Sequence, residues 1–320
     1  MSGPGREQPL PLVVVILGPT ATGKSDLALA LAQRFSGEIV SADSREIYRG
    51  LDVGTAKSPP ETRAFIPHHL LDLIDPRETY DVARYGEAAR AAFRDIAARG
   101  RVPLLVGGTG FYIRAATGEL SLPMVAADPA VRARLRRLAA DLGPHALHQR
   151  LAAVDPESAR RIHLNDLNRV VRALEVYELT GRPRTAFTTA EAGPDGEFRF
   201  LKIGLRLARD VLYARINQRV ENMIARGWGE EVGRLLQQGY PPDCPGLNTL
   251  GYPEIIACVQ GRCGLEEAAA SIQQQTRRYA KRQTTWFSRD REVHWLAADA
   301  PEVLERAAAL VRKAITGAQP

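Results

Sequence analysis

Cysteine is scarce in this chain of 320 residues, and its rarity excludes two kinds of architecture. The three cysteines are odd in number and form no C-x-x-C pair; they are Cys244, Cys258 and Cys263. Neither a disulfide framework nor a cysteine-ligated zinc site is therefore supported, and a reducing cytoplasm fits this composition. The six histidines show no metal-ligand spacing.

The sequence also lacks long apolar runs, and it has few lysines. No run of 18 apolar residues occurs, so that no membrane span is expected. The apolar stretch from Leu10 to Leu17 leads directly into a glycine-rich loop, and we do not expect it to be a signal peptide. The net charge is +6, and the 43 basic residues are 38 arginines and only five lysines. Arginine binds phosphates and stacks on bases, which favours an RNA or polyphosphate partner; genomic base composition is an equally good explanation of the count.

A glycine-rich phosphate-binding loop is the most specific signal that is present. Residues 18–25, GPTATGKS, fit the pattern G-x-x-x-x-G-K-[ST], follow the apolar run Leu12–Leu17 and precede a helical pattern from Asp26. In this context the backbone N–H groups bind phosphate oxygens, Lys24 reaches the terminal phosphates and Ser25 ligates Mg²⁺. The sequence thus predicts a diphosphate or nucleotide site, with ATP as one candidate, formed by Gly18, Pro19, Thr20, Ala21, Thr22, Gly23, Lys24 and Ser25.

Short apolar runs alternate with helical patterns, which is typical of an α/β fold with a parallel sheet. Strands are expected over 12–17, 38–41, 102–106, 200–205 and 293–296, and helices over 82–99, 268–287 and from Pro301. Residues 128–180 are helical in pattern, rich in arginine and free of strand signals. We predict a disordered leader (1–10), a P-loop NTPase-like core with C-terminal helices (11–122 and 198–320) and a mainly helical insertion (123–197).

Two polar side chains follow expected strands and suit catalysis. Asp43 and Thr109 fall at the carboxyl ends of their strands, where ligands bind in open α/β sheets. Asp43 suits Mg²⁺ binding or general-base catalysis, and equally well the N-cap of a helix. Gly107 and Gly108 allow close backbone approach, or simply form a tight turn. No acid ends the strand over 102–106, which disfavours a motor-type ATPase.

The segment over residues 280–287, AKRQTTWF, combines two cations with two aromatic residues. This composition suits neutralisation of an RNA backbone and stacking on bases. An amphipathic helix with Trp286 and Phe287 in the core explains it equally well. Arg169 and Arg172, three residues apart in the insertion, share a helix face and are further candidates for RNA binding.

Six motifs together resemble the bacterial tRNA dimethylallyltransferases, also called tRNA isopentenyltransferases. In order they are GPTATGKS (18–25), SADSREIYRGLDVGTAK (41–57), PHHLLD (67–72), LVGGTGFY (105–112), RVVRALEV (169–176) and AKRQTTW (280–286). The resemblance extends from about Leu12 to about Leu296. It implies transfer of a dimethylallyl group from dimethylallyl diphosphate to N6 of the adenosine 3′-adjacent to the anticodon in tRNA, with Mg²⁺ as cofactor.

The resemblance also implies roles for single residues. Asp43 would be the general base for the adenine amine, Lys24 and Thr109 would act on the leaving diphosphate, and Ser25 and Thr109 would ligate Mg²⁺. The diphosphate would also meet Arg215 and Arg219. The residues implied to contact tRNA are Asp43, Ser44, Arg45, Glu46, Thr109, Arg132, Asn168, Arg169, Val170, Val171, Arg172, Lys281 and Arg282.

Two positions depart from the family pattern, and alternative functions stay open. Glu46 and Asn168 stand where the family commonly has Gln or a similar residue, and Glu46 adds a negative charge near the RNA. The alternatives are a small-molecule kinase, a prenyltransferase acting on free adenine nucleotides and a non-catalytic RNA-binding protein. A basic insertion favours tRNA over the first two. We expect a monomer in the cytoplasm without a membrane partner.

Overall fold

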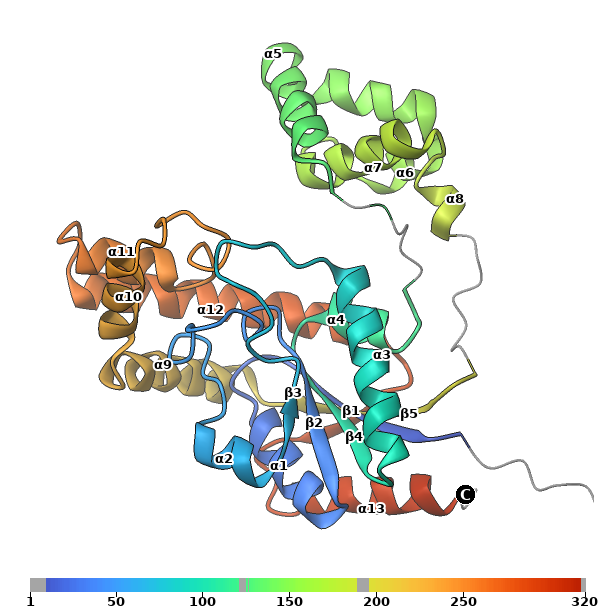
Figure 1. Ribbon diagram of the computed structural model, residues 1–320, viewed down its shortest axis with the longest axis vertical. Coiled ribbons are helices and arrows are strands. Elements are labelled where there is room, and N and C mark those ends of the chain that lie inside the picture. The colour runs from blue at the N-terminus through green and yellow to red at the C-terminus, as the bar shows by residue number, and fades with distance from the viewer. Residues whose placement is uncertain (1–9, 121–124, 126, 189–195, 318–320) are drawn as a thin grey trace, which may run out of the picture. The chain divides into compact units, whose positions relative to one another are not determined.

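The computed structural model describes residues 10–120, 125, 127–188 and 196–317. The chain forms two compact units (Figure 1): unit 1 comprises residues 1–117 and 196–320, and unit 2 comprises residues 118–195. These limits lie within a few residues of the boundaries expected at 122/123 and 197/198. Of the leader expected over residues 1–10, only Leu10 belongs to the described residues.

Unit 1 is built on a six-stranded parallel sheet with the order β3-β2-β4-β1-β5-β6. The strands are β1 (Leu12–Leu17), β2 (Gly37–Ala42), β3 (His68–His69), β4 (Val102–Gly107), β5 (Arg199–Arg206) and β6 (His294–Ala297). The predicted α/β fold is confirmed, and the five expected strands lie within a few residues of their predicted bounds. The sequence did not indicate β3, because an edge strand of two residues is too short to show a pattern.

Apolar residues on both faces place β1 at the centre of this sheet. Val13, Val15 and Leu17 join the hydrophobic cluster on one face, and Val14 and Ile16 join the cluster on the other. Side chains alternate along a strand, so a strand covered on both faces is a continuous apolar run. The central strand therefore holds the glycine-rich loop that follows it in a fixed position.

Helices cover the two faces of the sheet. One face is covered by α1 (Lys24–Arg34) and α13 (Val303–Thr316). The other is covered by α3 (Val82–Ala98), α4 (Gly110–Ala116) and, in part, by the helices between Arg209 and Phe287 whose bounds follow. The remaining helices of unit 1 are α2 (Pro60–Phe65), α9 (Arg209–Ala225), α10 (Trp228–Gln237), α11 (Tyr252–Val259) and α12 (Leu265–Phe287). In the described part of the chain, no helix has the length and apolar character that a membrane crossing requires.

The described residues of unit 2 form helices and the loops between them, without a strand. Its helices are α5 (Pro129–Val154), α6 (Pro156–Arg161), α7 (Leu167–Thr180) and α8 (Thr185–Thr188), and a separate apolar cluster holds α5, α6 and α7 together. Gly143 interrupts α5 with φ 84° and ψ 160°. The residue before a proline is disfavoured in the helical region, and Pro144 therefore starts a new helical segment.

Candidate active site

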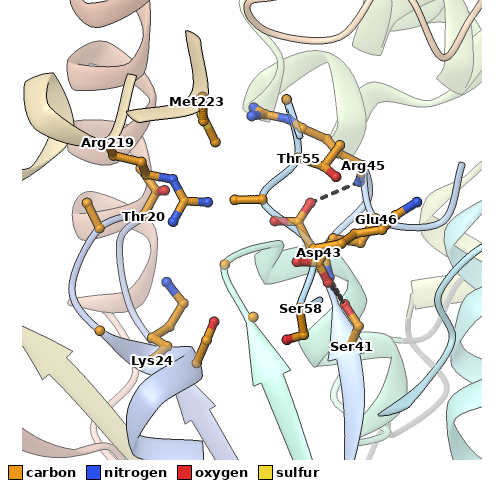
Figure 2. Close-up of a pocket in the computed structure, with 18 of the residues that line it drawn as sticks. Thr20, Lys24, Ser41, Asp43, Arg45, Glu46, Thr55, Ser58, Arg219 and Met223 are labelled. Carbon is orange, nitrogen blue, oxygen red and sulfur yellow. Dashed lines mark hydrogen bonds between the residues drawn. The ribbon is translucent and has the colours of Figure 1, made fainter. Parts of the chain in front are cut away.

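A cavity of about 640 Å³ lies in unit 1 where β1, β2 and β4 end. Its walls are the glycine-rich loop, residues 41–46 and 54–59, the end of β4, and faces of α9 and α12. In Figure 2 the side chains of Lys24 and Arg219 extend into it from one side, and Asp43 lies on the other. The cavity thus occupies the edge of the sheet at which ligands of open α/β folds bind.

The glycine-rich loop over 18–25 has its expected place between β1 and α1. Gly18 adopts φ 141°, and a Cβ there would lie 2.5 Å from the carbonyl oxygen of Leu205, so a larger residue is excluded. The Thr22 hydroxyl closes the loop by donating to the carbonyl oxygen of Pro19 at 2.9 Å. Of the eight predicted residues, those that line the cavity are Thr20, Ala21, Gly23, Lys24 and Ser25. Gly18, Pro19 and Thr22 shape the loop instead.

Cationic groups gather on the loop side of the cavity. The Lys24 Nζ donates to the Pro19 carbonyl oxygen at 2.7 Å, and burial together with the nearby Arg219 lowers its pKa to about 8. Burial is also the main reason why the pKa of Arg219 is lowered. Arg215 lies one helical turn before Arg219 on α9 and lines the same wall. Lys24 and Arg219 therefore carry positive charge that is partly withdrawn from bulk water, where an anionic ligand interacts strongly with it.

Asp43 lies in a turn that follows β2. Its Oδ1 accepts the backbone N–H of Arg45 at 2.9 Å, and residues 44–47 form turns rather than a helix. The interpretation of Asp43 as a helix N-cap is therefore wrong, since no helix begins there. The carboxylate is fixed by this turn and lines the cavity, as a general base must.

Glu46 lies near Asp43 and is half-buried. The Ser41 hydroxyl donates to its Oε2 at 2.5 Å. Burial, followed by the negative charge of Asp43, raises the pKa of Glu46 to about 7. Below pH 7 the side chain is mostly protonated and has an O–H that donates, as the amide of a Gln would. The negative charge expected from the sequence therefore develops as the pH rises through about 7.

Thr109 and Gln283 connect the loops around the cavity. The Thr109 Oγ1 accepts the backbone N–H of Ser44 at 3.1 Å, which joins the end of β4 to the loop after β2. The Gln283 Oε1 accepts the N–H of Thr20 at 2.9 Å, and its Nε2 donates to the carbonyl oxygen of Gly108 at 2.9 Å. A Cβ at Gly108 would lie 2.2 Å from that Nε2. Gln283 therefore positions the glycine-rich loop against β4, a role that its sequence motif did not reveal.

A buried carboxylate outside the cavity holds another of its walls. The Glu231 side chain on α10 accepts the backbone N–H groups of Asp52 and Val53, both at 2.7 Å, and of Gly54 at 3.2 Å. The Tyr252 hydroxyl donates to it at 2.8 Å. Because residues 54–59 line the cavity, Glu231 shapes this wall without touching a ligand.

Replacing Glu231 with Ala is expected to lower the free energy of unfolding by about 3 kcal/mol or more, because buried N–H groups lose their acceptor. Urea denaturation would measure the loss. Glu230, its exposed neighbour on α10, provides the matched control, and Glu230→Ala should change stability by less than about 0.5 kcal/mol. Equal stabilities of the two variants would show that Glu231 does not organise the wall.

The predicted tRNA contacts in unit 2 differ in how exposed their side chains are. Val170 and Val171 are 0% and 2% exposed and lie in the core of the unit, so the expectation that they contact tRNA is corrected. Arg132 and Arg172 both pair with the fully buried Glu175, at 2.8 and 2.6 Å, and thereby satisfy its charge. Arg169 stays accessible, with 59% of its side chain exposed.

Three further predicted contacts lie on exposed surface of their units. Asn168 is exposed on α7 and its Oδ1 accepts from Arg136 at 3.4 Å. Lys281 and Arg282 are exposed on α12, whereas Phe287 on the same helix is 3% exposed. The segment 280–287 therefore combines both interpretations, since its cations face solvent and one aromatic residue belongs to the core.

Comparison with known proteins gives a consistent result. Residues 46–290 match the family model for IPP transferase, and residues 11–64 match that for isopentenyl transferase. A tRNA dimethylallyltransferase of Roseiflexus sp. (strain RS-1) is 48% identical over 304 residues, 95% of this chain and 98% of the relative. A tRNA isopentenylpyrophosphate transferase from Bacillus halodurans has 39% identity and a TM-score of 0.68, with 96% of each chain covered. A eukaryotic dimethylallyltransferase acting on tRNA has 27% identity and a TM-score of 0.80, covering 97% of this chain and 80% of its own.

Proposed function

The chain belongs to the IPP transferase family, and we propose that it transfers a dimethylallyl group from dimethylallyl diphosphate to N6 of the adenosine 3′-adjacent to the anticodon in tRNA. One observation carries this proposal: the cavity sets Lys24 and Arg219 on one side and the carboxylate of Asp43 on the other. The first side suits a departing diphosphate and the second suits the proton of an attacking amine.

Stabilisation of the leaving group is the main task of the site. As the bond between C1 and the diphosphate oxygen breaks, positive charge grows on the allylic carbon and negative charge grows on the diphosphate. Lys24, which the Pro19 carbonyl oxygen holds in place, and Arg219, which lines the same cavity, carry a charge opposite to that of the diphosphate, and N–H groups of the glycine-rich loop can donate to it. Arg215, on the same wall as Arg219, and the hydroxyl of Thr109 are further proposed contacts.

Asp43 receives the proton of the adenine amine late in the reaction. The neutral amine is too weak an acid for a carboxylate to deprotonate it first. Bond formation between N6 and C1 makes the nitrogen cationic and acidic, and its proton then passes to Asp43. The turn that holds this carboxylate keeps it directed at the cavity.

A magnesium ion fits the residues that are present. Among the described residues, no three His, Cys, Asp or Glu side chains gather as metal ligands. Mg²⁺ is commonly held by substrate phosphates, water and one or two protein groups, so such a cluster is not needed. We propose Ser25 as a ligand, with Thr109, whose hydroxyl already accepts from Ser44, as a second contact. When bound, the ion would neutralise diphosphate charge.

A labelling experiment tests the proposed function. The protein is incubated with radiolabelled dimethylallyl diphosphate and with either unmodified tRNA or AMP. Label in the tRNA nucleoside is the expected result. Label in AMP alone would favour the prenyltransferase of free nucleotides, and label in neither would contradict prenyl transfer and return attention to a kinase or an RNA-binding protein.

Replacing Arg169 with Ala is expected to weaken tRNA binding in a salt-dependent way. An exposed arginine that meets a phosphate releases a counterion, so its loss should lower the slope of log affinity against log salt by about one. Filter binding over a series of salt concentrations measures this slope. Arg306→Ala on α13 is a control with a similar side-chain exposure of 56%. An Arg169→Ala slope equal to that of this control would exclude Arg169 from the RNA surface.

Two further expectations stay predictions. We expect the enzyme to act as a monomer and to work in the cytoplasm, where its tRNA substrate is found.

A further inference from the structure

An aromatic pair with an exposed ring lies at the surface of unit 1. Phe111 on α4 is 42% exposed, and its ring centroid lies 4.6 Å from that of Trp286 on α12, with the planes inclined by 53°. The two helices approach closely here, because a Cβ at Gly110 would lie 2.1 Å from the Trp286 Nε1. Nothing in the mechanism above uses this pair, which we call the aromatic rim.

The aromatic rim continues the wall of the cavity. On α12 the side chains of Thr276, Tyr279 and Gln283 line the cavity, and Trp286 follows at the next helical step of three residues on that face. On the other side, Gly107 and Gly108 line the cavity directly before α4 begins. The helix α12 and the segment from β4 into α4 therefore both lead from the cavity to the aromatic rim. A ligand that is only partly held in the cavity would extend over the aromatic rim.

The charges around the aromatic rim indicate the chemistry of that ligand. Lys281 and Arg282 are exposed on α12. The guanidinium of Arg45 lies 4.5 Å and that of Arg282 5.7 Å from the ring centroid of Tyr279, which lines the cavity. A flat apolar surface bordered by cations complements a nucleobase with its phosphodiester backbone. A purely apolar partner, such as the face of another protein, would leave these cations unpaired.

We propose that the aromatic rim, Phe111 with Trp286, is the stacking site for the nucleobase adjacent to the adenosine that enters the cavity. This inference rests on the proposed function. Withdrawing the target adenosine from the anticodon loop removes the stacking partner of its neighbour. The exposed Phe111 ring replaces that partner, and thereby helps to keep the loop open while the adenosine reacts.

Kinetics of Phe111 variants test the proposal. Phe111→Ala is expected to raise KM for tRNA about 10-fold, from the loss of one base–aromatic stack, with kcat and KM for the prenyl donor nearly unchanged. Phe111→Tyr keeps the ring and should restore the wild-type KM. Phe65→Ala provides the matched control, because Phe65 on α2 is 71% exposed and is not part of the cavity wall. An unchanged KM for tRNA in Phe111→Ala would overturn the proposal.

Fluorescence of a modified RNA gives a direct readout of stacking. Two anticodon stem–loop RNAs carry 2-aminopurine on the 5′ or the 3′ side of the target adenosine. Binding to the wild type and to Phe65→Ala should quench one of them, and Phe111→Ala should abolish that quenching. The stacking site would be refuted if neither RNA were quenched by any of the three proteins. It would also be refuted if quenching were the same in Phe111→Ala as in the wild type and Phe65→Ala. If the wild type modifies tRNA, an unchanged KM or unchanged quenching in Phe111→Ala refutes only the role of the aromatic rim. If the wild type does not modify tRNA, the proposed function itself is refuted.

Discussion

Replacing Lys24 with Met should lower kcat/KM for the prenyl donor by about 10²- to 10³-fold, the scale measured when one fixed donor to a developing negative charge is removed. Met keeps most of the apolar stem and removes the ammonium group. The loop should keep its shape, because Gly18, which no larger residue can replace, is unchanged and the Thr22 hydroxyl still donates to the Pro19 carbonyl oxygen, the acceptor that it shares with the Lys24 ammonium. Steady-state kinetics with labelled donor would measure the loss.

The pH dependence separates the charge of Lys24 from its packing. A pKa of about 8 means that the free enzyme carries the ammonium below pH 8 and loses it above. kcat/KM for the donor should therefore fall as the pH rises through about 8, and Lys24→Arg, whose side chain stays charged, should lack this fall. Glu46, with a pKa of about 7, should cause a separate change in kcat/KM near pH 7, and Glu46→Gln should remove that change.

Lys313→Met is the matched control for Lys24, because this lysine is exposed on α13 and does not line the cavity. It should leave kcat/KM and its pH profile unchanged. A Lys24→Met variant within about threefold of the wild type would show that the lysine does not act on the diphosphate.

Local patterns explain why much of the fold and part of the site could be predicted. The apolar run Leu12–Leu17, the loop over 18–25 and the helix α1 that continues from it are contiguous, and each imposes its own backbone geometry. The helices predicted over 82–99 and 268–287 likewise follow from periodicity within the segment. Such patterns do not depend on contacts with distant residues, and the bounds predicted from them therefore agree with the structure to within a few residues.

Long-range polar contacts explain what the sequence did not reveal. The hydrogen bond from the Thr20 N–H to Gln283 spans 263 positions, and the one from the Gly54 N–H to Glu231 spans 177. No local pattern marks a Gln or Glu that will accept such groups. The two valines at 170 and 171 are a different case, since their helical period places them inward while Arg169 faces outward. The family resemblance assigns the whole motif to tRNA, whereas the helical period separates its two inward valines from the outward Arg169.

Replacing Asp43 with Ala is expected to lower kcat by about 10²-fold or more while the affinity for tRNA stays nearly intact, because a general base acts on the chemical step. The turn geometry raises a second explanation, in which the carboxylate merely accepts the Arg45 N–H. Asp43→Asn distinguishes the two. An amide oxygen still accepts that N–H, but an amide does not take up the proton of the cationic amine.

Asp43→Asn should therefore lose as much turnover as Asp43→Ala, although it disturbs the turn less. Asp75 provides the control for the turn itself, since its Oδ1 accepts the N–H of Arg77 at the same distance of 2.9 Å and it does not line the cavity. Asp75→Asn should leave kcat unchanged. Single-turnover assays on enzyme saturated with both substrates would measure the chemical step without product release. If Asp43→Asn kept full turnover while Asp43→Ala lost it, the carboxylate would serve the turn, and the proton would leave by another route.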